Sequence, residues 1–146
     1  MATYYVDPAG SNTPPYDTPA KAANLPATVV AHGNSTPGPH TVYVLQGTYN
    51  SAFVLTDSDW ANSNIVGVKD FVFLTPAEKG DVVVSPEGTT YPLRASVADI
   101  TVSNITFTSN GTVGQILFST TGGVGLVLNN VHAYDAPLQL FNFAAL

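Results

Sequence analysis

Four short strand-like runs recur along this chain at nearly constant spacing. The runs VYVL, FVFL, ITVS and LVLN begin at Val42, Phe71, Ile100 and Leu126, so successive starts are 29, 29 and 26 positions apart. Each run is rich in β-branched or aromatic residues, which favour strands. A fixed period of about 20–50 residues is typical of stacked repeat architectures. The spacing therefore predicts an all-β solenoid whose coils each add short strands.

The last two repeats align best, with residues 99–107 lying over residues 125–133. The alternation of apolar residues matches on both sides of a two-residue corner, and Asn104 falls on Asn130. Asparagine tolerates a left-handed backbone, and its amide can bond to the equivalent residue of the next coil. We therefore predict Asn104 and Asn130 as structural corner residues. A β-sandwich with frequent turns is the alternative architecture.

The strand prediction covers most of the chain, and the runs are short and separated by Gly, Asn, Asp and Pro. The predicted strands are 4–6, 41–45, 52–55, 71–74, 82–84, 100–102, 105–107, 116–118, 126–128, 131–133 and 138–141. One short helix is predicted over residues 17–24, where Pro19 suits the first helical position. Pro26 is expected to end or kink this helix, and a Pro- and Gly-rich loop is expected over residues 32–40.

In these features the chain resembles the right-handed single-stranded parallel β-helix proteins of the pectate-lyase-like superfamily. The stretch YYVDPAGSN at 4–12 is similar to their first strand and Gly-Ser turn, and DTPAKAAN at 17–24 to their capping helix. VYVLQGTY at 42–49 is similar to a family strand, with Gln46 where proline is usual, and residues 100–107 and 126–133 to Asn-cornered coils. The resemblance implies a right-handed parallel β-helix (β-solenoid) with a short N-terminal capping helix. That superfamily contains lyases, hydrolases, adhesins and purely structural proteins.

Length and spacing together give the expected organisation. The 146 residues suit a single domain, with the N-terminal strand, capping helix and loop in residues 1–40 and the coils in residues 41–146. At 26–29 residues per coil, the second part holds about four coils, which is short for a β-helix enzyme.

Only 10% of the residues are charged, and the net charge is −6. Four cations cannot form the basic patch that nucleic acids require, so no nucleic-acid partner is predicted. No apolar run approaches the ~18 residues of a membrane helix, so no membrane span is predicted. Cysteine is absent, which excludes disulfides and thiolate metal sites.

The C-terminal stretch carries no charge from Ala136 onward and alternates in the manner of a strand. Terminal coils of repeat proteins are usually polar, and natural sheet edges are protected by Lys, Pro or a bulge. We therefore predict a self-association surface at this end of the chain. Alternatively, the tail folds back as its own cap, or the chain is part of a longer protein. The predicted contact residues are Leu138, Leu140, Phe141, Phe143 and Leu146.

Candidate catalytic groups are few. A β-helix lyase needs a base and cations or calcium to stabilise an enolate. Lys69 or Arg94 with Asp70 or Asp99 supply the residue types, but their spacing does not bring them together. We therefore assign no catalytic residue; whether the chain is an enzyme stays open, with the residues weighing against it.

No cofactor is predicted, although Asp57 and Asp59 offer hard oxygens that suit Ca²⁺. Alternate residues share one face of a strand, so these two carboxylates are expected on the same side, beside Trp60. His32, His40 and His132 have no acidic residue at a metal-ligand spacing and are expected to be ordinary loop histidines.

These expectations point to a structural β-helix subunit, extracellular or at the cell surface. Its predicted partners are copies of itself, joined end to end, including as a filament. The alternative is the N-terminal portion of a carbohydrate-active β-helix enzyme (a polysaccharide lyase, hydrolase or phage-type depolymerase) or a glycan-binding module. A glycan-binding module would use Trp60 and exposed tyrosines.

Overall fold

The computed structural model describes residues 1–87, 91–109, 115–119, 125–134 and 139–143. These residues form short strands, one α-helix and two single-turn 3₁₀ helices. The strands are β1 (Ala2–Val6), β2 (His40–Leu45), β3 (Gly47–Tyr49), β4 (Phe53–Leu55), β5 (Asn64–Val68), β6 (Val82–Val84), β7 (Leu93–Ala95), β8 (Thr101–Ser103), β9 (Thr106–Thr108), β10 (Gln115–Ser119), β11 (Val127–Asn129), β12 (His132–Tyr134) and β13 (Gln139–Phe143). The helices are η1 (Pro19–Lys21), α1 (Pro26–Gly33) and η2 (Ser58–Trp60).

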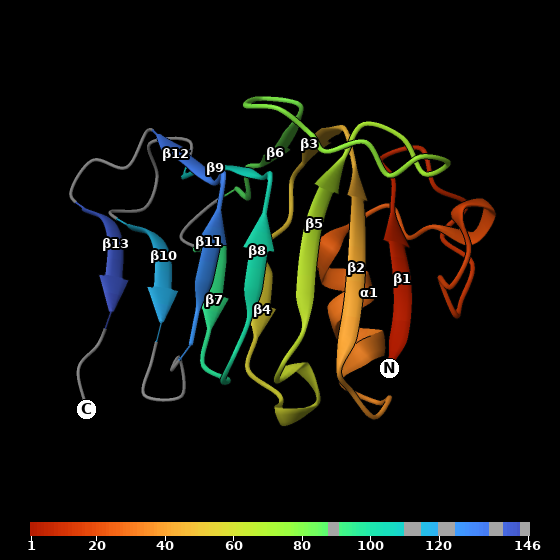
Figure 1. The fold of residues 1–146 in the computed structure, drawn as a ribbon, viewed down its shortest axis with the longest axis horizontal. Coiled ribbons are helices and arrows are strands. Elements are labelled where there is room, and N and C mark those ends of the chain that lie inside the picture. Colours follow the sequence, from red (N-terminus) through yellow and green to blue (C-terminus); the bar gives the residue numbers. More distant parts are fainter. Residues whose placement is uncertain (88–90, 110–114, 120–124, 135–138, 144–146) are drawn as a thin grey trace.

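The strands form three parallel sheets. The first sheet has the order β1-β2-β5-β8-β11, the second β3-β6-β9-β12 and the third β4-β7-β10-β13. From β2 onward the chain visits the first, second and third sheets in turn, and then returns to the first beside the strand it left. In Figure 1 the strands of the first sheet point upward and those of the third point downward, with β1 and β13 at opposite ends. Every pairing between these strands is parallel, so the alternative of a β-sandwich is wrong.

Register along the first sheet corrects one of the predicted repeats. Val42 pairs with Ile65, Ile65 with Val102, and Val102 with Leu128, at spacings of 23, 37 and 26 residues. The strand beside β2 is therefore β5, not the predicted strand at 71–74, which lies in a loop. The strands β3, β5 and β7 lie outside the predicted runs.

The core lies between the three sheets, because alternate residues of their strands point inward. Its largest fully buried side chains include Trp60, Tyr4, Tyr49, Phe53 and Phe107. The Tyr49 hydroxyl lies 2.6 Å from the Leu45 carbonyl and 3.2 Å from the Val6 carbonyl. Burial raises the pKa of Tyr49, so the phenol stays protonated and ties β3 to β1 and β2.

The N-terminal end is closed by a helix in a different place from the predicted one. Residues 17–24 contain only the turn η1, whereas α1 begins at Pro26. The backbone N–H at the first helical position has no partner within the helix, so a proline, which lacks this N–H, is well suited to it. Pro26 therefore starts the helix instead of ending it. The helix packs against β1 and β4, and Gly33 lies against the Trp60 ring, where a Cβ would overlap it. The loop predicted over 32–40 is correspondingly shorter, because α1 runs to Gly33 and β2 begins at His40.

Corner residues stack from one turn of the chain to the next. Asn104 and Asn130 have φ values of 59° and 50°, and the Asn130 Nδ2 donates to the Asn104 Oδ1 at 3.0 Å. Asp99 and Gly125 form a second stacked pair with positive φ before β8 and β11. Gly67 lies under the Asn104 carbonyl, which a Cβ at that position would overlap. Glycine there allows β5 to pass straight beneath the corner.

Candidate functional site

The first sheet presents two outward rows of side chains that carry no charge. They alternate with the inward residues of β1, β2, β5, β8 and β11, and each is half-buried or exposed. Parallel neighbours lie about 4.8 Å apart, so each row forms a ladder across the strands. The residues of these rows, which we call the neutral face, are Tyr5, Tyr43, Val66, Ser103 and Asn129 in one row and Thr3, Thr41, Asn64, Thr101 and Val127 in the other.

Three aromatic rings meet at the β1 end of the neutral face. The ring centroids of Tyr5 and Tyr43 are 5.9 Å apart with planes inclined at 34°. The Phe71 ring meets Tyr5 edge to face, at a centroid distance of 5.1 Å. Edge-to-face and tilted pairs are favourable aromatic geometries. The neutral face therefore ends in an ordered aromatic platform.

Phe71 is held in place by a structured loop over residues 69–76, which crosses above β2 and β1 in Figure 1. The Asp70 Oδ1 accepts from the amides of Val72 at 3.0 Å and Phe73 at 2.5 Å. A hydrogen bond from the Thr75 side chain, together with these amides, lowers the pKa of Asp70. The loop leaves Val72 and Phe73 82% and 85% exposed, although both are large and apolar.

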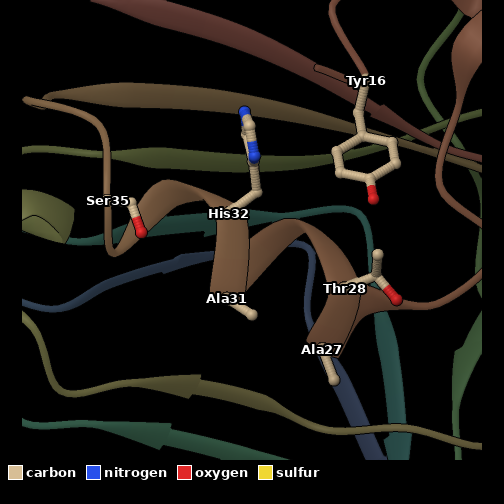
Figure 2. A pocket seen from close by; sticks show the side chains of 6 residues that line it. All are labelled: Tyr16, Ala27, Thr28, Ala31, His32 and Ser35. Carbon is tan, nitrogen blue, oxygen red and sulfur yellow. The ribbon is translucent and has the colours of Figure 1, made fainter. Parts of the chain in front are cut away.

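An open depression lies on the exposed side of α1. Ala27, Thr28, Ala31 and His32 of α1 line it with Tyr16 and Ser35. Figure 2 shows His32 and Tyr16 projecting to the same side of the helix. Their rings meet edge to face at 5.3 Å. The lining contains no carboxylate or lysine, so this depression lacks a general acid–base pair of carboxylates.

A buried aromatic cluster lies beneath this depression. The His40 ring contacts Trp60 at 4.7 Å and Tyr4 at 5.3 Å, and Tyr4 in turn contacts His32 at 5.6 Å. Neither ring nitrogen of His40 makes a hydrogen bond, nor does the Tyr4 hydroxyl. Burial lowers the pKa of His40, against the opposing effects of the Gly33 carbonyl and Asp59. His40 was expected to be an ordinary loop histidine, but it begins β2 and is fully buried.

The candidate lyase residues lie in separate structural settings. Lys69 pairs with Glu78 at 3.2 Å and Asp81 at 3.6 Å, which raises its pKa, and it follows β5 of the first sheet. Arg94 lies on β7 of the third sheet. Asp70 bonds the amides of its own loop, and Asp99 occupies a corner beside Gly125. The carboxylates that pair with Lys69 are therefore Glu78 and Asp81, not the predicted Asp70 or Asp99.

The candidate calcium residues do not share a strand face. Asp57 caps η2, and its Oδ1 accepts from the Asp59 amide at 3.0 Å. Because Ser58–Trp60 forms a helical turn, the alternation expected of a strand does not apply here. Within the described residues, no group of three or more His, Cys, Asp or Glu could hold a metal ion. Trp60 is fully buried, with its Nε1 donating to Asn34 at 2.8 Å, so it offers no ring to a sugar.

The two ends of the sheets differ. The edge of β1 that faces away from β2 bonds to the segment that follows β1 in the chain: the Tyr5 amide donates to the Tyr16 carbonyl, and the Ala23 amide donates to the Tyr5 carbonyl. At the other end, β11, β12 and β13 are the last strands of their sheets. In the described part of the chain, nothing pairs with their outer edges. Inward residues of this end are only partly buried, namely Leu126, Leu128, Val131 and Ala133.

The predicted self-association residues fall in this C-terminal region. Leu140, Phe141 and Phe143 belong to β13, whose backbone pairs with β10 in the register Leu117 to Phe141. Leu138 and Leu146 lie outside the described residues.

Sequence reasoning missed the neutral face, because its rows depend on the unpredicted strand β5. The alternation of the buried Ile65 and Gly67 with the more exposed Asn64 and Val66 is weak in the sequence, since one of the buried positions is a glycine.

Comparison with protein-family models, curated proteins and solved structures gives no match to this chain. Among the described residues, no helix is long and apolar enough to cross a membrane.

Proposed function

We propose that this chain is a structural β-helix subunit that associates through its C-terminal edge. The three parallel sheets and the cyclic path of the chain support a β-helix of four turns, running from β2 to β13. Crossovers between parallel strands are right-handed in about 98% of cases, which supports a right-handed coil. We further propose that the subunit lies at the cell surface or in the extracellular space.

The difference between the two ends is the observation that carries this proposal. The N-terminal end is closed by α1 and by the segment bonded to β1, which satisfies the exposed backbone groups. The C-terminal edge consists of β11, β12 and β13, with the inward Leu128 half-buried and the outward Val127 46% exposed. Unpaired strand edges template pairing with another chain. This edge is therefore the favoured contact surface.

A second copy of the chain is the proposed occupant. Pairing of the C-terminal edges of the two copies would extend the sheets and bury the apolar ends of both cores. Head-to-tail growth would require displacing the bonds from Tyr5 to Tyr16 and Ala23. Contact between two identical edges is isologous and closes at two subunits. The covered N-terminal end therefore favours a closed pair over the filament expected from the sequence.

Analytical ultracentrifugation at micromolar concentration tests the proposal. We expect the chain to sediment as a dimer that dissociates on dilution. The variant Val127→Lys with Asn129→Lys places charges on the outward side of edge strand β11, where a second copy would bring its own lysines close. This variant should sediment as a monomer.

The matched control is Thr101→Lys with Ser103→Lys, at the register partners one strand further in. It has the same charge change on the same face, and it should remain dimeric. A wild-type chain that is monomeric at all concentrations would contradict the proposal. Fibres in electron micrographs would support association but contradict closure at two subunits.

A further inference from the structure

We propose that the neutral face is a binding site for a neutral polysaccharide, with Tyr5 and Tyr43 contacting sugar rings. The tyrosines of this site lie on β1 and β2, at the capped end of the first sheet, and the site shares only Val127 and Asn129 of β11 with the C-terminal edge. It requires neither self-association nor a catalytic group.

The chemistry of the neutral face matches that of an uncharged sugar. A pyranose ring has apolar C–H faces and a rim of hydroxyl groups. Tyrosine rings provide large, rigid contact area for the apolar face, and their hydroxyls can bond to the rim. Further along the rows, threonine and serine hydroxyls and asparagine amides both donate and accept hydrogen bonds. These groups occupy Thr3, Thr41, Asn64, Thr101 and Ser103.

The absence of charge selects the class of polysaccharide. No residue of either row is acidic or basic, so the face offers no cation to a uronate or sulfate group. The whole chain carries a net charge of −6, which repels polyanions at low ionic strength. A neutral polymer meets no such electrostatic repulsion. An acidic polymer is repelled and finds no cationic side chain in the two rows to offset the repulsion.

The geometry is prepared before any ligand arrives. Tyr5 is fixed between Tyr43 and Phe71, and Asp70 fixes the loop that carries Phe71. Ordered aromatic groups lose little conformational freedom on binding, which favours affinity. The two rows run across parallel strands at a repeat of about 4.8 Å, so an extended polymer can lie along them and contact several strands.

Binding to a panel of soluble polysaccharides tests this proposal with the full chain. The panel holds a neutral β-glucan, a galactomannan and an arabinan, with polygalacturonate and alginate as acidic members. We expect affinity electrophoresis to retard the protein in at least one neutral polymer and in neither acidic one. Isothermal titration calorimetry then measures the affinity for the polymer that binds.

The variant Tyr43→Thr removes one ring and retains a residue that favours strands. It should weaken binding about tenfold, which corresponds to a loss of about 1.4 kcal/mol. Tyr134→Thr is the matched control, because Tyr134 is 43% exposed but lies on β12 of the second sheet. Its affinity should equal that of the wild type, and circular dichroism should show both variants folded.

Three results would overturn the proposal. They are no retardation by any neutral polymer, retardation by the acidic polymers alone, and equal weakening by Tyr43→Thr and Tyr134→Thr. If Tyr43→Thr does not fold, Tyr5→Thr on β1 replaces it, with the same expected loss. The variant Tyr43→Thr also separates the two proposals, because Tyr43 lies on β2, away from the C-terminal edge: weakened polysaccharide binding with a retained dimer would support both. Loss of the dimer in Tyr43→Thr would make the site part of that contact instead.

Discussion

His40 is a titratable side chain enclosed by aromatic rings, without a hydrogen bond to either ring nitrogen. Burial holds its pKa below the ordinary value of 6.5, although Asp59 and the Gly33 carbonyl oppose the shift. As the pH falls, His40 is therefore protonated at a higher pH in the unfolded chain than in the folded protein. The contribution of neutral His40 to stability is fully present above pH 6.5 and is progressively lost below it.

We expect the free energy of unfolding of the wild type to decrease between pH 7.5 and pH 5.5 more than that of His40→Phe. Urea denaturation at the two pH values measures this difference. His132→Gln is the control, because it also removes one histidine, but His132 lies on β12, outside the aromatic cluster around His40. An identical pH dependence in wild type and His40→Phe would show that another group controls it.

At the scale of single elements, the Asn104–Asn130 pair combines two effects that substitution can separate. Asn130 has a φ of 50°, and its amide bonds to Asn104 at 3.0 Å. Asn130→Gly keeps the backbone conformation and removes the bond, which should cost about 0.5–1.5 kcal/mol. Asn130→Ala also adds left-handed strain, for a further cost of about 1–2 kcal/mol. Asn129→Ala, on the adjacent exposed residue, should be nearly neutral.

Thermal or urea unfolding of the three variants checks this order. Equal destabilisation by Asn130→Gly and Asn130→Ala would mean that the backbone conformation at this corner carries no strain. A cost at Asn129 equal to that at Asn130 would mean that the stacked amide contributes nothing specific.

Elements were predictable where local alternation and corner chemistry agree, as in β8, β9, β11 and β12. They were not predictable where a local side-chain bond or a tertiary contact overrides the alternation of apolar residues. The run at 71–74 favours a strand, but the Asp70 carboxylate binds the amides of Val72 and Phe73 and turns the chain. In β5, Gly67 interrupts the apolar run for a reason found only in the fold, the overlying Asn104 carbonyl.

At the scale of the whole molecule, the spacing of 29, 29 and 26 predicted stacked strands but not their partners. The true intervals of 23, 37 and 26 vary because the loop at 69–76 is inserted after β5. Only the parallel register brings Tyr5 and Tyr43 side by side, so the neutral face could not be predicted from either residue. The uncharged C-terminal stretch contributes β13, the last strand of the third sheet.

The open C-terminal edge makes a prediction about how stability is distributed along the first sheet. Ile65 and Leu128 occupy one inward row, separated by Val102, but Ile65 is fully buried and Leu128 is only half-buried. Truncation of a fully buried large aliphatic side chain costs about 2–5 kcal/mol. Ile65→Ala should therefore cost this much at any protein concentration, and Leu128→Ala should cost less in dilute solution.

Association at the edge would change that comparison. If a second copy covers β11, Leu128 becomes buried, and the cost of Leu128→Ala should rise toward that of Ile65→Ala as the protein concentration increases. Urea denaturation at submicromolar and at high micromolar concentrations measures both costs. In the Val127→Lys, Asn129→Lys background, which blocks the edge, the cost of Leu128→Ala should stay at its dilute value. A concentration-independent cost in the wild-type background would mean that no second copy covers the core at this end.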